Sequence, residues 1–170
     1  MVLPGGGPGI RVAVAGTFGP VHDGHRALFE TAPEFGYDGV VVALTADELA
    51  RETRHEPRPV PPLPERRERV RAVLSALDEW SRAVEIRTLE RPHGIAATAS
   101  VLDALVVSPE TMSELPERND ERRDRGLDPL LGLVVPFVEA EDGERISSTR
   151  MVQGKIDEHG RVARDGDESG

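Results

Sequence analysis

A strand, a glycine turn and the start of a helix follow one another directly near the beginning of the chain. After the apolar stretch 10–15 the sequence runs Gly16-Thr17-Phe18-Gly19-Pro20-Val21-His22-Asp23-Gly24-His25. Gly16 allows the backbone to bend sharply and to approach a ligand closely. Asp23 is suited to cap the helix, whose first N–H groups form a natural site for an anion. This arrangement predicts a phosphate site, and a nucleotide as its ligand.

Two histidines lie three residues apart across this helix start, so both imidazoles of His22 and His25 can face one side and bind phosphoryl oxygens together. The same spacing also suits a metal. The other histidines are scattered and the chain has no cysteine, which disfavours a structural zinc site. A strand, turn and helix without any ligand, as in many α/β proteins, is the other alternative.

Composition limits the class of protein. With 170 residues, 38% of them hydrophobic and 31% charged, the chain is expected to form one globular domain. We find no stretch near the roughly 20 apolar residues that cross a bilayer, and no signal peptide pattern, so a cytoplasmic protein is expected. The net charge of −10 disfavours nucleic acid or an anionic membrane as partner. Acid excess and a single lysine suggest adaptation to high salt.

Apolar runs alternate with helix-patterned stretches along the chain. Strands are predicted at 10–15, 39–44, 83–89, 104–107 and 130–138, and helices at 46–54, 65–80 and 110–125, with a proline-rich loop at 57–64. This order predicts an α/β fold with a doubly wound, mainly five-stranded parallel sheet of the Rossmann-like kind, which binds ligands at the carboxyl ends of its strands. We expect a flexible N-terminus at 1–9, the domain at 10–156 and a polar, mobile tail at 157–170.

A second motif lies far along the chain, at Ile146-Ser147-Ser148-Thr149-Arg150. Taken singly, its hydroxyl residues are ordinary helix caps and its arginine a solvated charge. The first motif resembles the phosphate-binding motif of the HxGH nucleotidyltransferases. The second is similar to the segment that opens a late helix in that superfamily and holds the triphosphate. The ordered pair is far more specific than either motif alone.

Further blocks resemble one family of that superfamily, the archaeal phosphopantetheine adenylyltransferases. They lie at 106–111, 119–122, 126–127, 140–143 and 154–160. The resemblance spans roughly residues 10–160 and implies the reaction of ATP with 4′-phosphopantetheine to give dephospho-coenzyme A and pyrophosphate. A sibling nucleotidyltransferase that makes NAD, FAD or a CDP-alcohol, and a catalytically silent nucleotide-binding protein, remain as alternatives. The sequence leaves the oligomeric state open, with a monomer as the first expectation.

The resemblance also implies roles for individual side chains. His25, with Thr17 and the helix start, binds the α and β phosphates, and His22 steadies the triphosphate. Ser148 and Arg150 hold its β and γ end. The implied catalytic residues are His22, His25, Arg54 and Arg150.

Ser108, Glu110 and Thr111 follow a predicted strand, where the resemblance implies contacts to adenosine; helix capping is the alternative for these residues. Mg²⁺ is expected to bridge phosphate oxygens, without side-chain ligands from the protein. The implied ATP-binding set is Gly16, Thr17, Phe18, Gly24, His25, Ser108, Glu110, Thr111, Ser147, Ser148, Thr149 and Arg150.

The chain departs from the family pattern at two places. Gly19 stands where the family usually has aspartate, and the segment after the second strand lacks the usual lysine. Arg51 or Arg54 would then supply the cation near the transferred phosphate, and we favour Arg54. Arg66 resembles the family's acceptor-side arginine; its alternative is a solvated arginine on a helix. We expect the acceptor groove around the loop before Arg66, with contacts from Thr17, Arg54 and Arg66.

Overall fold

A five-stranded sheet organises the computed structural model, which describes residues 10–53, 59–77, 82–91, 94 and 101–164. The strands are β1 (Arg11–Gly16), β2 (Gly39–Thr45), β3 (Val84–Leu89), β4 (Ala104–Val107) and β5 (Leu131–Val134). Their order is β3-β2-β1-β4-β5, and every neighbouring pair is parallel. The predicted parallel sheet is thereby confirmed.

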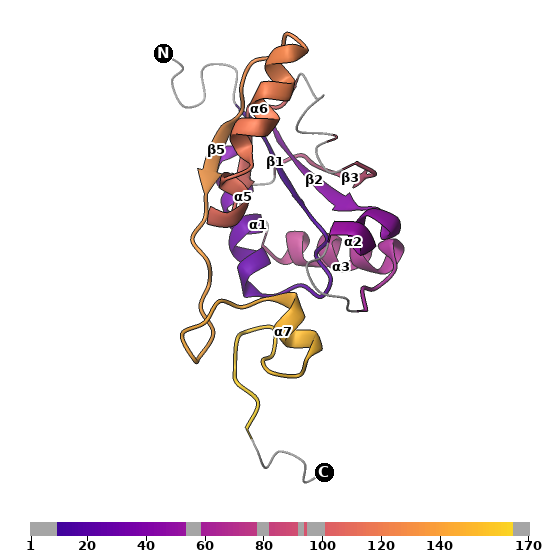
Figure 1. The fold of residues 1–170 in the computed structure, drawn as a ribbon, viewed down its shortest axis with the longest axis vertical. Coiled ribbons are helices and arrows are strands. Elements are labelled where there is room, and N and C mark those ends of the chain that lie inside the picture. The colour runs from indigo at the N-terminus through magenta and orange to yellow at the C-terminus, as the bar shows by residue number, and fades with distance from the viewer. Residues whose placement is uncertain (1–9, 54–58, 78–81, 92–93, 95–100, 165–170) are drawn as a thin grey trace.

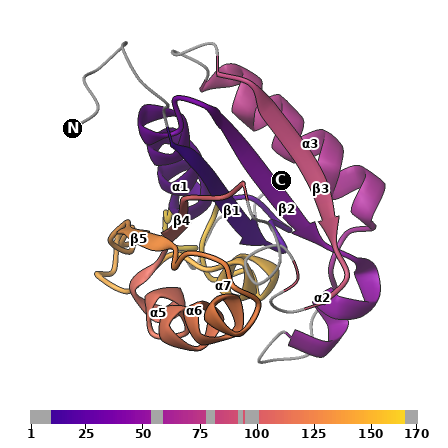
Figure 2. The ribbon, with the colours of Figure 1, turned by 90° about the horizontal axis from the view of Figure 1, so that it is seen from above.

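Helices cover both faces of this sheet. They are α1 (Asp23–Phe35), α2 (Asp47–Thr53), α3 (Leu63–Ala76), α5 (Pro109–Met112), α6 (Leu115–Asp124) and α7 (Ser148–Val152). Figure 2 shows α1 and α3 on one side of the strands and α5 and α6 on the other. The sheet is therefore doubly wound, as expected. None of the helices that the structure describes has the length and apolar character needed to cross a membrane.

Three predicted elements have different bounds in the structure, and proline explains each difference. The helix predicted at 65–80 begins at Leu63, because Pro64 fits the first turn, where no N–H is needed. The helix predicted at 110–125 is divided into α5 and α6, and α6 also has a proline in its first turn. The strand predicted at 130–138 ends at Val134, since Pro136 cannot donate to the ladder.

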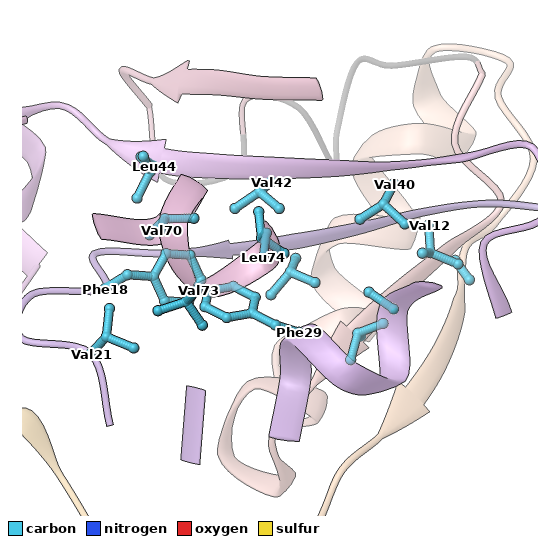
Figure 3. Packing of buried hydrophobic residues seen from close by; sticks show 14 residues of the cluster. Val12, Phe18, Val21, Phe29, Val40, Val42, Leu44, Val70, Val73 and Leu74 are labelled. Carbon is cyan, nitrogen blue, oxygen red and sulfur yellow. The ribbon is translucent and has the colours of Figure 1, made fainter. Parts of the chain in front are cut away.

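Alternate residues of the central strands enter two separate cores. The larger core lies beneath α1 and α3, and Figure 3 shows Phe29 of α1 against Val70 and Val73 of α3 and the strand residues Val12, Val40, Val42 and Leu44. The smaller core on the other face joins Ala13, Val41 and Leu105 to Leu115 of α6. Because both faces are covered, the strands are apolar along their length, and the sheet forms a rigid base for the loops at its carboxyl edge.

The carboxyl-terminal segment crosses beyond that edge and brings α7 near the start of α1 (Figure 1). It has a small apolar cluster of its own, formed by Ala140, Ile146 and Ile156. Residues 157–164, placed in a polar tail by the sequence, continue this segment: Ile156 bridges to Val162, and the backbone N–H of Asp23 donates to the carbonyl of Glu158 at 2.9 Å. Residues 1–9 and 165–170 lie outside the described part.

Candidate active site

Two imidazole rings cap the first turn of α1. His22 is the capping residue, and its Nδ1 accepts a hydrogen bond from the N–H of Gly24 at 3.0 Å. In return, Nδ1 of His25 accepts from the N–H of His22 at 3.3 Å. This is a capping box built from imidazoles instead of a hydroxyl and a carboxylate. Asp23, expected as the cap, lies inside the first turn instead, because the ring of His22 occupies the capping position.

These bonds determine where each ring carries its proton. A ring nitrogen that accepts from a backbone N–H has no hydrogen of its own, so the neutral rings of His22 and His25 are protonated at Nε2. The rings stack with their centroids 3.8 Å apart, and both residues line the same pocket. The turn therefore presents imidazole N–H donors together with the amino end of a helix, a combination suited to phosphate.

Ring packing explains the glycines of the first motif. A Cβ at Gly24 would lie 2.8 Å from Cε1 of His22, and a Cβ at Gly16 would lie 3.0 Å from the ring of Phe18. Phe18 itself has a φ of 51° and is buried, with its ring edge-on to His25 at 5.1 Å between centroids. The left-handed backbone at this residue is rare for bulky side chains and often marks a functional site.

A pocket of about 390 Å³ opens at the carboxyl ends of β1 and β4, where the chain changes direction across the sheet. It brings together residues from three separate parts of the chain: Gly16, Thr17, Phe18, His22, Gly24 and His25; Ser108, Glu110 and Thr111; and Ser147, Ser148 and Thr149. Eleven of the twelve expected ATP-binding residues thus line one cavity, and Arg150 is the exception.

Arg145 is a pocket residue that the sequence reasoning missed. Its guanidinium donates to Glu110 at 2.8 Å and lies 4.8 Å from the ring centroid of Phe137. Arg145 directly precedes the second motif, and this position in the sequence could have identified it as a pocket residue. On the same side of the pocket, Ser108 accepts from the N–H of Thr111 at 3.2 Å and caps α5. Ser108 therefore caps a helix, as the alternative reading of the sequence expected, and it also lines the pocket.

The second motif is held against the first. Ser147 caps α7 by accepting from the N–H of Arg150 at 3.2 Å, and Oγ of Ser148 donates to the carbonyl of Pro20 at 2.7 Å. The guanidinium of Arg150 pairs with Asp142, beside the pocket, in an adjoining hollow that also contains Lys155. The hydrogen bond from Arg150 keeps the pKa of Asp142 below its usual value, and a second hydrogen bond, from the N–H of Glu144, acts in the same direction.

Charged residues fasten the carboxyl-terminal segment to α1. Arg26 donates to Asp23 at 3.0 Å and to Glu158 at 2.9 Å, and Nδ1 of His159 lies 3.0 Å from Asp23. We call these four residues the clamp. The hydrogen bond from Arg26 lowers the pKa of Glu158, against the opposing effect of burial. The clamp therefore connects the helix that begins at the histidines to the segment that contains the second motif.

A second pocket, of about 270 Å³, shares Gly16, Thr17, Ser108 and Thr111 with the first. Its other walls are largely apolar, with Thr45, Leu49, Leu89, Leu105, Val106, Val107, Glu114 and Arg118. This pocket lies at the ends of β1–β4, whereas the described part of the loop before Arg66 borders a different hollow, outside Phe18 and Pro20. This hollow meets the first pocket at Phe18, and the acceptor groove expected around that loop stays a prediction.

Comparison with known proteins agrees with this geometry. The cytidylyltransferase-like family matches residues 13–154. The phosphopantetheine adenylyltransferase of Methanopyrus kandleri is 43% identical over 87% of this chain and 91% of its own. That of Methanosarcina acetivorans is 37% identical over 91% of this chain and 97% of its own.

The chain belongs to the phosphopantetheine adenylyltransferase family. A solved structure of an Archaeoglobus fulgidus protein of unknown function superposes with a TM-score of 0.63 and 30% identity, over 74% of this chain and 89% of that one. The family inferred from the dispersed motifs is confirmed.

A buried arginine fills the space beside Gly19, the position where the family usually has aspartate. A Cβ at Gly19 would lie 2.7 Å from Cδ of Arg66, whose side chain is only 1% exposed. Its guanidinium donates to the carbonyls of Pro61, Thr17 and Thr45 at 2.8, 3.0 and 2.8 Å and to Asp47 at 2.8 Å.

Arg66 is therefore not the solvated side chain that the sequence offered as an alternative, and its contact with the acceptor stays a prediction. Its donors are directed at carbonyls that end β1 and β2, so it ties the two loops together beneath the pockets. Its hydrogen bond lowers the pKa of Asp47. Of the two arginines considered for the missing lysine, Arg51 is exposed on α2 and lines neither pocket, and Arg54 lies outside the described residues.

Gly24→Ala tests the imidazole cap. In an ordinary helical position this change stabilises a protein by about 0.4–1 kcal/mol. Here the methyl group would displace the ring of His22, so we expect the free energy of unfolding to fall by about 1 kcal/mol through loss of the cap. ATP affinity, measured by calorimetry, should fall with it. Ala27→Gly weakens the same helix without touching the ring and should leave ATP affinity unchanged; equal effects of both variants would contradict this account.

Glu158→Gln tests the clamp. We expect weaker ATP binding and a loss of about 0.5–1 kcal/mol of stability, the range for partly exposed pairs. Because the pKa of Glu158 is lowered in the folded protein, its contribution is present at neutral pH and is lost as the pH falls through that lowered pKa. Wild type and variant should therefore converge in acid. Glu85→Gln breaks a comparable pair with Arg87 on β3 and serves as control; the same ATP affinity in both variants would refute the clamp.

Proposed function

We propose that this chain transfers the adenylyl group of ATP to 4′-phosphopantetheine, giving dephospho-coenzyme A and pyrophosphate. The main support is the single pocket at the carboxyl edge of the sheet, which unites both phosphate-binding motifs with the residues after β4. Relatives named phosphopantetheine adenylyltransferase, at 33–43% identity, support the choice of acceptor. We assign the acceptor to the pocket that extends from Thr17.

The reaction is a displacement at phosphorus. An oxygen of the acceptor phosphate forms a bond to the α-phosphorus of ATP, the bond from that phosphorus to the bridging oxygen breaks, and pyrophosphate leaves with the bonding electrons. The acceptor is already an anion, so the step needs no general base. Catalysis then consists of positioning and of stabilising charge on the phosphoryl oxygens.

The first motif would hold the reacting phosphates. We assign His25, the amino end of α1 and Thr17 to the α and β phosphates, and His22 to the triphosphate beside them. The Nε2 donors created by the cap make both histidines suitable for this task without a change of tautomer. Removing one such donor typically costs about 3–4 kcal/mol in the transition state.

The other residues of the pocket would hold the ends of the nucleotide. Ser147, Ser148 and Thr149 face the β and γ end, with Arg150 kept next to it by Asp142. Ser108, Glu110 and Thr111, together with Arg145, are assigned to the adenosine side. The roles of Arg54 and of Arg66 at the acceptor remain predictions from the resemblance, and the burial of Arg66 favours an indirect role for it.

Mg²⁺ would enter with ATP, bound by phosphate oxygens and water as is usual for this ion. Within the described residues, no group of three or more His, Cys, Asp or Glu side chains is arranged to hold a metal. When bound, the ion would neutralise charge on the triphosphate. We propose further that the protein acts in the cytoplasm, where ATP is available, and as a monomer, because the described residues of one chain form both pockets.

An acceptor panel tests the proposed function. Purified protein with Mg²⁺ and ATP is given 4′-phosphopantetheine, nicotinamide mononucleotide, flavin mononucleotide or glycerol 3-phosphate, the last also with CTP, and pyrophosphate release is measured. We expect a strong response only to 4′-phosphopantetheine, and its loss in His25→Ala with an unchanged circular dichroism spectrum. A higher kcat/KM for another acceptor would contradict the assigned substrate, and no release with any acceptor would contradict an enzymatic role.

The acidic composition supports a further proposal, that the protein is adapted to high salt. Asp and Glu number 31 against 21 Lys and Arg, and a single lysine occurs in the chain. Salt screens the repulsion between surface carboxylates, so the melting temperature should rise as KCl is added to molar concentration. A steady fall of Tm over that range would contradict the adaptation.

A further inference from the structure

One arginine that lines the second pocket has a buried N–H group without an acceptor. Arg118 of α6 has a side chain only 12% exposed, and its Nη2 donates to Glu114 at 3.0 Å. Its Nε is buried and is the one buried side-chain nitrogen or oxygen in the described part of the chain that has no partner. A buried donor left without an acceptor is unfavourable, by about 1–3 kcal/mol, and rare in folded proteins. The guanidinium of Arg118 is thus incompletely paired and lines a pocket, where a ligand can contact the part of it that is not closed off.

A second arginine on the same helix shows that burial alone is not the reason. Arg122 lies one turn further along α6 and is 1% exposed. Its Nε donates to the carbonyl of Asp128 at 2.6 Å, and its Nη2 to that of Leu102. The chain thus provides backbone acceptors for the arginine that faces the protein interior. Arg118, which lines the second pocket, donates instead to a side chain, that of Glu114.

The second pocket has the shape and polarity of a site for a thin, mainly apolar chain. One end is formed by residues shared with the nucleotide pocket, Thr17 among them, and Leu49, Leu89 and Leu105 form its walls. Glu114 and Arg118 line only this second pocket and not the first. A phosphate that reacts with ATP must lie at the shared end, so the part of the acceptor beside Arg118 is the arm and not the phosphate.

We propose that Arg118 is a specificity-determining residue, which donates a hydrogen bond to an amide carbonyl oxygen of the pantetheine arm. This inference rests on the proposed function. The carboxylate of Glu114 compensates the positive charge of Arg118, so a neutral carbonyl suits the remaining N–H groups better than a second anion. The leucines would cover the methylene groups of the arm, and the guanidinium would recognise its polar link.

Arg118→Met tests this assignment, since methionine keeps the length and apolar stem but removes every N–H. We expect the KM for 4′-phosphopantetheine to rise about 10- to 100-fold, the range for loss of a charged hydrogen bond, while the KM for ATP stays unchanged. Pantetheine without the phosphate, used as a competitive inhibitor, should weaken by a similar factor. The ligand-free variant should melt no lower than wild type, because an unsatisfied donor has been removed.

Arg123→Met is the matched control. Arg123 lies on the same helix, is 69% exposed and pairs with Asp120, so its replacement should leave both KM values unchanged. An unchanged acceptor KM in Arg118→Met, or a lower melting temperature without a change in KM, would overturn the inference and make Arg118 a structural residue. A loss confined to the phosphorylated ligand would overturn it in favour of phosphate binding.

The same assay separates this inference from the function on which it rests. A wild-type protein that neither uses 4′-phosphopantetheine nor binds pantetheine would overturn both. A wild type that does both, with an Arg118→Met variant that matches it, would overturn the inference alone and leave the proposed function standing.

Discussion

The site depends on two hydrogen bonds from backbone N–H groups to imidazole Nδ1 atoms at the start of α1. They close the first turn of the helix, fix the orientation of both rings and place the ring protons at Nε2. The glycine between the histidines follows from the same contact, because a Cβ there would collide with the ring of His22. Capping and the proposed phosphate binding therefore involve the same residues, so a change that affects one should affect the other.

The remaining parts of the site are held at this turn by contacts between segments distant in the chain. Arg66 donates to the carbonyls of Thr17 and Thr45 at the ends of β1 and β2, and its side chain fills the space beside Gly19. From the other side, Ser148 donates to the carbonyl of Pro20 and Glu158 binds Arg26. These bonds join segments that are distant in the sequence, so polar contacts organise the pocket on a rigid apolar base.

The sequence predicted the sheet because apolar runs such as those of β2 and β4 alternate with helix-patterned stretches, and it predicted most of the pocket because the motifs are specific. It did not predict which arginines are buried, since helix 65–80 contains several and the converging carbonyls of Thr17 and Thr45 become visible only in the fold. Asp23 was chosen as the cap because carboxylates usually cap helices, whereas here an imidazole does. Nothing in the sequence indicates that the Nε of Arg118 is buried without an acceptor. The role of Arg54 near the transferred phosphate stays a prediction.

Nitrogen-15 NMR of histidine-labelled protein tests the central claim directly. Long-range couplings between ring nitrogens and carbon-bound protons distinguish the two neutral tautomers, and His22→Asn and His25→Asn variants assign the signals. The structure predicts that both rings, when neutral in the folded, ligand-free protein, carry the proton at Nε2 and leave Nδ1 as acceptor. A neutral ring of either residue protonated at Nδ1 would show that the imidazoles do not cap α1 and would contradict the account.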